Sequence, residues 1–204
     1  LLTILGAKAV GFDGDIGSLA AIGELLHLGS LLHDDVVDEG QERRGKKAAQ
    51  RVYGNPAVIL TGDYCVARGL LLSAEHGGHE AVTKLAWTVT AMSEGEVTQL
   101  LNRGNLDLDV ETYMDIVYKK SATLIAWCVA AGAWAVDDAD AAEKLNTFGL
   151  SVGTAFQITD DALKKLTKQP AWNHLLKSKK VVEQLRHACL QQRSEVYLLK
   201  RKKN

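Results

Sequence analysis

The chain has 204 residues, of which 47% are hydrophobic and 24% are charged, the balance of a soluble globular protein of one domain. The net charge of -1 gives no basic surface of the kind that binds nucleic acid, so we predict no nucleic-acid partner. The longest stretch without a charge, residues 121–136, is shorter than the roughly 20 apolar residues that cross a bilayer, so we predict no transmembrane segment. Three widely spaced cysteines in apolar stretches favour a reducing compartment, here the cytoplasm.

Helices are the predicted elements along the whole chain. Only two prolines occur, and no stretch alternates polar and apolar residues as a half-exposed strand does. The first predicted helix is buried, and the second opens with Asn55 as its N-cap and Pro56 at its first position. Glycines predict stops or breaks at 77–78, 104 and 132. The predicted helices cover residues 17–38, 55–72, 79–102, 110–135, 140–166 and 172–201.

An acidic cluster ends the first buried helix. At about 100° per residue, Asp34 and Asp38 fall within about 40° of each other, one turn apart on one face. Carboxylates so close repel unless a cation neutralises them, and oxygen ligands with room for water and phosphate suit Mg²⁺. A generic acidic cluster is more often a solvated helix end, but acidic residues are disfavoured near a helix C-terminus. The position of this cluster therefore indicates a function other than helix stability.

Two adjacent arginines, Arg43 and Arg44, follow between Gly40 and Gly45. The guanidinium group is a rigid fork of donors that matches phosphate oxygens two at a time. An isolated arginine pair in a loop is usually only solvated. Acid followed by base in this order predicts a cation held by the carboxylates and a diphosphate held by the arginines.

A second aspartate pair, Asp160 and Asp161, follows an apolar run late in a predicted helix. Asp161 lies within about 40° of Gln157 around the helix and Asp160 within about 60°, so the three side chains could face one cavity. Such groups are costly to bury unless they are paired or bind metal. Lys120 and Ser121 could hold a phosphate group, although a lysine at a helix edge is commonplace.

Four softer candidates lie inside apolar helices. Core hydrogen bonding or a bound substrate would explain Asp63, Glu96 and Gln99, and the structural explanation is slightly favoured for the two acids. His27 lies about 20° from Asp34 around the helix, which places it toward the same cavity. A lone histidine on an apolar face is more often a core residue, but this alignment favours a function.

Taken in order, these motifs resemble the trans-prenyl diphosphate synthases of the polyprenyl synthetase family. The aspartate motif of that family, Asp-Asp-x-x-Asp, matches residues 34–38, and Arg43-Arg44-Gly45 follows at the expected interval. The resemblance covers roughly residues 4–163, continuing through residues 62–64, 95–100, 113–122 and 156–161. It implies an all-α fold, an antiparallel helical bundle around a central cavity of the isoprenoid synthase kind, usually in a homodimer.

The resemblance also implies roles for individual residues. About three Mg²⁺ ions would be bound together with diphosphate by Asp34, Asp35 and Asp38 on one wall and by Asp160 and Asp161 on the opposite wall. The allylic diphosphate would contact Arg43, Lys120, Ser121 and Gln157. Isopentenyl diphosphate would be placed by His27 and Arg44, with Asp63, Glu96 and Gln99 as cavity support.

The predicted reaction is the condensation of isopentenyl diphosphate with an allylic diphosphate by a Mg²⁺-dependent prenyltransferase. Gly29 and Ser30, both small, stand where this family places the floor of the chain-growth pocket, so we expect a product of about C20 or longer. Two alternatives stay open: a non-catalytic helical subunit of a prenyl synthase and a class I terpene cyclase. The paired arginines count against the cyclase, which takes one diphosphate substrate.

The chain departs from the family pattern in three places. The early Gly-Lys-x-Arg segment is absent, the second motif has Lys164 in place of its third aspartate, and the usual loop beyond Leu163 is not recognisable. We therefore expect a single domain over residues 1–204 that lacks an N-terminal segment and the loop after residue 163. A short chain that has lost turnover is the alternative, and Lys164 favours it.

Overall fold

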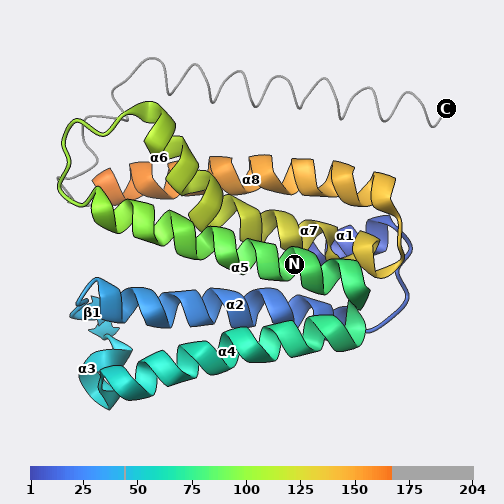
Figure 1. The fold of residues 1–204 in the computed structure, drawn as a ribbon, viewed down its shortest axis with the longest axis horizontal. Coiled ribbons are helices and arrows are strands. Elements are labelled where there is room, and N and C mark those ends of the chain that lie inside the picture. Colours follow the sequence, from blue (N-terminus) through green and yellow to red (C-terminus); the bar gives the residue numbers. More distant parts are fainter. Residues whose placement is uncertain (44, 167–204) are drawn as a thin grey trace. The chain divides into compact units, whose positions relative to one another are not determined.

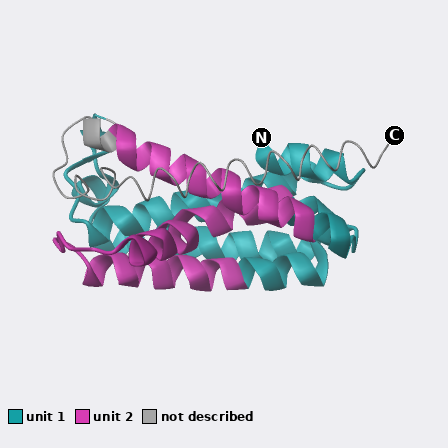
Figure 2. Cartoon of the chain, turned by 90° about the horizontal axis from the view of Figure 1, so that it is seen from above, with its two compact units in different colours: residues 1–86, 130–142 teal, residues 87–129, 143–204 magenta. Residues whose placement is uncertain are grey.

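The computed structural model describes residues 1–43 and 45–166. These residues divide into two compact units (Figure 2): unit 1 comprises residues 1–86 and 130–142, and unit 2 comprises the described part of 87–129 and 143–204. The prediction of a helix over residues 172–201 lies outside the described residues. Three helices contribute residues to both units: α5 (Gly78–Leu101), α7 (Thr123–Ala135) and α8 (Ala139–Leu166).

Unit 1 is built on two antiparallel helices, α2 (Ile16–Val37) and α4 (Asn55–His76), which pack along their lengths (Figure 1). Leu19, Ile22 and Leu26 of α2 are almost fully buried. Gly69 of α4 makes room for one of them, because a Cβ atom at this position would lie 2.3 Å from the side chain of Leu26. Small residues on α4 thus allow the branched side chains of α2 to approach its backbone.

The rest of unit 1 connects and extends this pair. The connection between α2 and α4 is a two-stranded antiparallel hairpin, β1 (Glu42–Arg43) and β2 (Lys46–Lys47), followed by the short helix α3 (Ala49–Tyr53). Gly45 lies in the hairpin turn with a φ of 74°, a conformation that glycine adopts at little cost. Helix α1 (Leu2–Ala9) precedes α2. The hairpin and α3 were not predicted, because elements of two and five residues are too short to show a period.

Unit 2 is organised around a helical segment that changes its pitch. Helix α6 (Val110–Val117) runs through a π-helical turn, η1 (Tyr118–Ala122), into α7. Asp109 caps α6, since its carboxylate accepts hydrogen bonds from the backbone N–H of Thr112 at 2.7 Å and from the Thr112 hydroxyl at 2.9 Å. The core cluster near α6 comprises Leu108, Tyr113, Val117 and Ile158, with Met114 packed against it.

The all-α prediction is confirmed, and most predicted helix bounds are close to the observed ones. Two local predictions are wrong. Gly54, with a φ of 81°, is the N-cap of α4, and Asn55 is the first helical residue. Gly132 does not break a helix but lies inside α7, where a Cβ atom would come within 2.5 Å of the Cα atom of Ala7. Close packing, not a break in the helix, explains this glycine.

Two helices of the described residues, α2 and α4, are long and apolar enough to cross a membrane by length and composition. The core helices of soluble proteins meet the same criterion. Because α2 and α4 pack on each other and carry the acidic residues Asp34, Asp35 and Asp63, their apolar character does not indicate a membrane protein.

Candidate functional site

The three aspartates at the end of α2 have different surroundings. Asp34 and Asp38 are one helical turn apart, as the 2.8 Å hydrogen bond from the backbone N–H of Asp38 to the carbonyl of Asp34 shows. Asp35 is only 6% exposed. Its Oδ1 atom accepts a hydrogen bond from Arg43 Nε at 2.7 Å and forms an ion pair with Arg43 Nη2 at 2.6 Å. Arg43 on β1 therefore neutralises a buried carboxylate, as buried charges require.

The loop after α2 is fixed by Gln50 of α3. The Nε2 atom of Gln50 donates to the carbonyl of Asp35 at 2.6 Å and to the carbonyl of Gly40 at 2.7 Å. Arg51 adds a contact from the surface, with its Nη2 atom 3.2 Å from the carbonyl of Glu39. These donors satisfy carbonyls in and beyond the last turn of α2 and hold the hairpin beside it.

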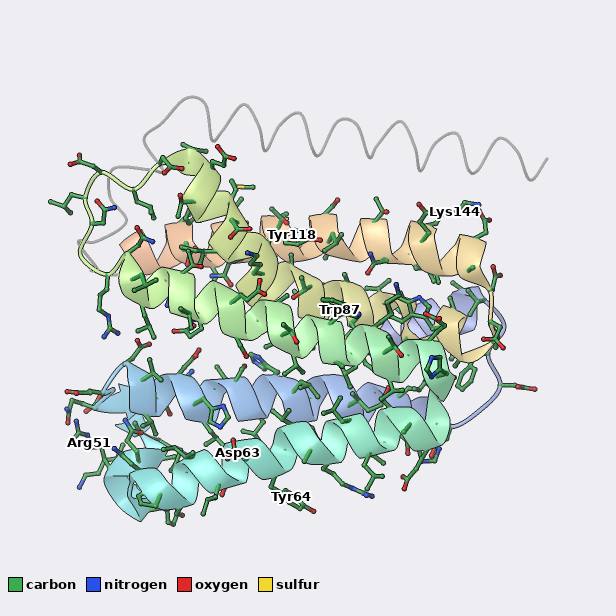
Figure 3. The ribbon with its side chains drawn as sticks, viewed as in Figure 1. Arg51, Asp63, Tyr64, Trp87, Tyr118 and Lys144 are labelled. Atoms are coloured by element: carbon green, nitrogen blue, oxygen red, sulfur yellow. The ribbon has the colours of Figure 1, made fainter. Side chains whose placement is uncertain are left out.

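Asp63 has a partner on the neighbouring helix. The Nε2 atom of His33 on α2 lies 3.2 Å from Asp63 Oδ1 and 3.2 Å from the carbonyl of Ile59. Gly62 leaves space for this ring, because a Cβ atom there would lie 2.3 Å from His33 Nε2. Figure 3 shows Asp63 on the side of α4 toward α2, whereas Tyr64 next to it points away. The Gly62-Asp63 pair thus ties α4 to α2.

Gly29, one of the two residues of the predicted pocket floor, and His27 occupy different faces of α2. Gly29 is buried against α4, where an added Cβ atom would lie 3.1 Å from the carbonyl of Gly62 and 3.3 Å from Cys65 Cβ. Helix packing alone therefore requires a small residue at 29. His27 is exposed, and its backbone carbonyl accepts a 2.9 Å hydrogen bond from the Ser30 hydroxyl.

In unit 2, η1 presents its two lysines to different acids. Lys119 Nζ lies 3.0 Å from Asp115 and 3.4 Å from Glu94, and its hydrogen bond to Asp115 is the main reason why the pKa of Lys119 is raised. The ammonium group of Lys120 instead forms an ion pair with Glu96. The two lysine side chains are similarly exposed, but Glu96 is only 18% exposed, whereas the partners of Lys119 are 44% and 57% exposed.

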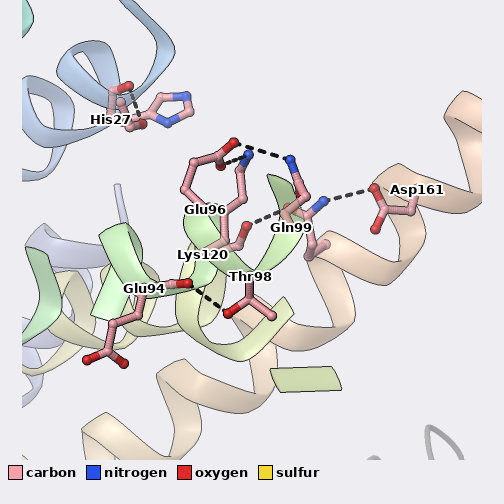
Figure 4. Close-up of polar contacts among 10 residues, drawn as sticks. His27, Glu94, Glu96, Thr98, Gln99, Lys120 and Asp161 are labelled. Atoms are coloured by element: carbon pink, nitrogen blue, oxygen red, sulfur yellow. Dashed lines mark hydrogen bonds and ion pairs between the residues drawn. The ribbon is translucent and has the colours of Figure 1, made fainter. Parts of the chain in front are cut away.

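Glycine allows this arrangement. A Cβ atom at Gly95 of α5 would lie 2.9 Å from the backbone nitrogen of Lys120, so only glycine lets η1 come this close. The ion pair of Lys120 then continues along α5, where Glu96 accepts a 3.4 Å hydrogen bond from Gln99 Nε2 (Figure 4). Glu96 and Gln99, singled out in the sequence, thus position a lysine.

The second aspartate motif lies in a chain of hydrogen bonds. The Ser121 hydroxyl donates to Gln157 Oε1 at 2.6 Å, and Gln157 Nε2 donates to Asp161 Oδ1 at 3.0 Å. The hydroxyl of the buried Tyr113 donates to Asp161 Oδ2 at 3.0 Å. Burial, and then the Asp161 carboxylate, raise the pKa of Tyr113 above its ordinary value, so its phenol stays a donor.

The structure brings the predicted residues together in two sets. Unit 1 holds the aspartates of α2 with Arg43 and, on α2 itself, His27. Unit 2 holds Lys120, Ser121, Gln157 and Asp161 in hydrogen-bonded contact with their neighbours, with Asp160 half-buried on α8. That the two motifs face one cavity stays a prediction, and the role predicted for Arg44 lies outside the described residues.

The donors present fit Mg²⁺ bound together with a ligand. Within residues 1–43 and 45–166, no three His, Cys, Asp or Glu side chains gather closely enough to hold an ion by themselves. Mg²⁺ usually takes one or two carboxylates and completes its shell with waters and phosphate oxygens. Carboxylate oxygens are suited to coordinate Mg²⁺. The guanidinium group of Arg43 and the ammonium group of Lys120 are suited to donate hydrogen bonds to the phosphate oxygens of the ligand.

An aspartate pair late in each of two helices, with Arg43 beside one of the pairs, indicates the class of protein that binds diphosphate with a divalent metal. The comparisons with known proteins agree with this class. The model of the polyprenyl synthetase family matches residues 1–175. The chain therefore belongs to the polyprenyl synthetase family.

Individual relatives are similar over most of this chain. The chain is 37% identical over 165 residues to an octaprenyl diphosphate synthase of Escherichia coli, covering 80% of the chain and 51% of that protein. It is 37% identical over 168 residues to a short chain isoprenyl diphosphate synthase of Methanothermobacter thermautotrophicus, covering 79% and 52%. The chain thus spans about half the length of these relatives.

A solved structure supports the fold. A polyprenyl synthase from Caulobacter crescentus, crystallised with calcium and isoprenyl diphosphate, aligns with a TM-score of 0.76 and 40% identity. The alignment covers 79% of this chain and 50% of that chain.

Two contributors to the site were missed from the sequence. Tyr113 lay within the family resemblance but received no role, although a tyrosine in a buried helix usually needs a partner for its hydroxyl. Gln50 belongs to a short helix with no periodic signal, so no pattern singled it out.

Proposed function

We propose that this protein is a Mg²⁺-dependent trans-prenyl diphosphate synthase that condenses isopentenyl diphosphate with an allylic diphosphate. Membership of the polyprenyl synthetase family carries the proposal. It is supported by the two cations that acidic partners already hold near the aspartate motifs, Arg43 beside Asp35 and Lys120 beside Glu96. Side chains held in place in this way bind a ligand with less loss of conformational entropy.

The metal ligands in this proposal are Asp34 and Asp38 of α2 and Asp160 of α8. When bound, Mg²⁺ supplies Lewis-acid neutralisation of the negative charge on a departing diphosphate. Asp35 is buried, and its Oδ1 atom is already paired with the guanidinium group of Arg43. We therefore assign Asp35 chiefly to the orientation of Arg43.

The chain's own polar groups bind and orient the two substrates. Arg43, Lys120, Ser121 and Gln157 hold the allylic diphosphate, and His27 and Arg44 hold isopentenyl diphosphate. In the reaction, the bond from the allylic carbon to the diphosphate oxygen breaks, and the diphosphate leaves with the electron pair. The alkene of isopentenyl diphosphate attacks the allylic carbon, and a proton is then lost to the freed diphosphate. Apolar surroundings keep water away from the allylic carbocation that forms when the diphosphate leaves.

The product is proposed to be about C20 or longer, since a deeper apolar pocket accommodates a longer chain. Support comes from the small Ser30 and from the octaprenyl name of the Escherichia coli relative. Gly29 adds less support than its size suggested, because contact with α4 already requires glycine there. The short-chain name of the other relative shows that identity at this level leaves length open.

We further propose a homodimer in the cytoplasm. Exposed apolar side chains on α5 favour a second copy as partner: Val97 is 55% exposed and Leu101 82% exposed. Val97 also borders a groove of about 660 Å³ that includes Lys119. The free thiols of Cys65 and Cys128 support a reducing compartment. Sedimentation velocity of the purified protein tests the dimer, and a monomer at micromolar concentration would contradict it.

The activity is tested by incubation with radiolabelled isopentenyl diphosphate, allylic primers of several lengths and Mg²⁺. We expect label in polyprenyl diphosphates of C20 or longer, resolved by chain length. A product that stops at C15 with excess isopentenyl diphosphate would contradict the length assignment. A cyclised hydrocarbon formed without isopentenyl diphosphate would identify a cyclase. No incorporation would identify a non-catalytic helical subunit.

A further inference from the structure

The π-turn η1 meets a glycine from each of two neighbouring helices. A Cβ atom at Gly95 of α5 would lie 2.9 Å from the backbone nitrogen of Lys120, and one at Gly153 of α8 would lie 2.6 Å from the Cα atom of Ala122. Both glycines lie inside long helices, where glycine is less stable than alanine. The close approach of η1 therefore explains why glycine stands at both positions.

The backbone of η1 is an irregular turn that needs support from its surroundings. The N–H of Thr123 donates to the carbonyl of Tyr118, five residues earlier, which is the hydrogen bond of a π-helix. The Thr123 hydroxyl donates to the carbonyl of Lys119 at 2.8 Å. Because a π-turn is rare and persists only where neighbouring structure fixes it, we attribute its support to the backbones of α5 and α8 pressed against it.

Each of the two glycines lies next to a residue that holds a side chain of η1. Lys120 forms its ion pair with Glu96, which follows the glycine of α5 directly in sequence. Ser121 donates at 2.6 Å to Gln157, which lies one helical turn beyond the glycine of α8. The separation of the backbones at each glycine therefore sets the distance across which one of these two contacts forms.

We propose that Gly95 and Gly153 are positioning residues of the diphosphate site. Together they hold η1 in its π form and close to α5 and α8, so that Lys120 and Ser121 are aligned before a ligand binds. An alanine at either position would push η1 away by up to about 1 Å, a displacement that is large for a binding site. The inference rests on the proposed function for the identity of the ligand.

Diphosphate binding tests this role without catalysis. Inorganic diphosphate is titrated into the purified protein in the presence of Mg²⁺, and binding is measured by isothermal titration calorimetry. We expect Gly153→Ala to raise the Kd by about 10-fold or more and Gly95→Ala, where the overlap is smaller, by about threefold. Gly132→Ala is the matched control, because a Cβ atom there would lie 2.5 Å from the Cα atom of Ala7, far along α7 from η1. Its Kd should change by less than about twofold.

Stability and kinetics distinguish positioning from a general loss of packing. Gly132→Ala and Gly153→Ala crowd a backbone to a similar degree, so their Tm values should fall by similar amounts. Only Gly153→Ala should raise the KM for the allylic diphosphate, by about 10-fold, while the KM for isopentenyl diphosphate changes by less than about twofold. Gly95→Ala, with its smaller overlap, provides the same test if Gly153→Ala is unfolded at the assay temperature.

Three results would overturn the inference. Folded Gly95→Ala and Gly153→Ala variants with the diphosphate Kd of the wild type would show that η1 needs neither glycine for binding. An equal rise in Kd for Gly132→Ala would reduce the effect to packing in general. A wild-type protein that binds no diphosphate with Mg²⁺ would remove the site itself. Absence of prenyl product alongside the expected Kd values would refute the proposed function and leave the roles of the two glycines standing.

Discussion

The two aspartate pairs of this chain have the same sequence but different partners. In unit 1 the second aspartate, Asp35, is buried and forms a hydrogen bond and an ion pair with the guanidinium of Arg43. In unit 2 the second aspartate, Asp161, accepts from neutral groups, the Tyr113 hydroxyl and the Gln157 amide. One carboxylate is thus paired with a charged side chain, and the other accepts hydrogen bonds from two uncharged side chains.

This difference shows that a repeated motif does not imply a repeated environment. A buried carboxylate that loses its cation becomes an uncompensated charge, whereas one that loses a neutral donor loses a single hydrogen bond. Partner loss should therefore destabilise unit 1 more than unit 2. The comparison between the two aspartate pairs is tested by variants that change either a predicted metal ligand or the partner of a buried aspartate, but not both.

The largest effect is expected for activity when the first aspartate of α2 is removed. Asp34→Ala should lower turnover by about 100-fold or more, since loss of transition-state charge stabilisation typically has this effect. The Arg43–Asp35 pair is untouched, so stability should stay close to that of the wild type. Steady-state kinetics with saturating Mg²⁺ measure the change, and the exposed Asp13→Ala is a control. Near-normal turnover in Asp34→Ala would refute the assigned role.

The next effect concerns the charged partner of Asp35. Arg43→Met keeps much of the side-chain length but leaves the buried carboxylate without its cation, so we expect a loss of about 2 kcal/mol in the free energy of unfolding. Urea unfolding measures it. Arg51→Met, which removes an exposed arginine that donates to the carbonyls of Glu39 and Gly40, should change stability by less than about 0.5 kcal/mol. Equal losses in the two variants would argue against the Arg43–Asp35 pair.

A smaller effect is expected for the neutral partner of Asp161. Tyr113→Phe keeps the buried ring and removes one hydrogen bond to a carboxylate, for which we expect a loss of about 1 kcal/mol. Tyr118→Phe is the matched control, since the Tyr118 side chain is 46% exposed. If Tyr113→Phe destabilised the protein more than Arg43→Met, the contrast between the two aspartate pairs would be reversed.

The smallest effect is expected at two helix N-caps, one in each unit. Backbone and side-chain hydrogen bonds from Ser18 lower the pKa of Asp15, and those from Thr112 lower the pKa of Asp109. A lowered folded-state pKa stabilises the protein fully above the unfolded pKa of about 3.9, and this contribution is lost as the pH falls through the folded pKa.

Asparagine at these positions keeps a capping side chain without a titrating charge. Asp15→Asn and Asp109→Asn should therefore leave the Tm near neutral pH almost unchanged. Between about pH 5 and pH 3, the Tm of each variant should fall less steeply than that of the wild type. If the Tm of the variants and of the wild type fell equally over this range, Asp15 and Asp109 would not contribute to the loss of stability at low pH.

The sequence predicted most of the helices because helical periodicity is a local property. The bounds of α2, α5 and α8 follow from the apolar spacing within each segment and, for α5, from the glycines at 77–78 and 104 that flank it. The partner of Asp161 could not be found in this way, since Tyr113 lies 48 residues away. Nor could the role of Gly29, whose size depends on how closely α4 approaches. Residue types were therefore predictable at the site, and their contacts were not.

The change of pitch at η1 has a consequence for how this chain tolerates insertions and deletions. A π-turn accommodates one residue beyond what a regular helix of the same length would need. Deleting one residue from Tyr118–Ala122 would restore an unbroken α-helix and be well tolerated by the backbone. Because the wider turn absorbs the extra residue, the deletion would leave α6 and α7 nearly in phase. Its effect would fall on the turn itself, where Lys119, Lys120 and Ser121 would no longer keep their present directions.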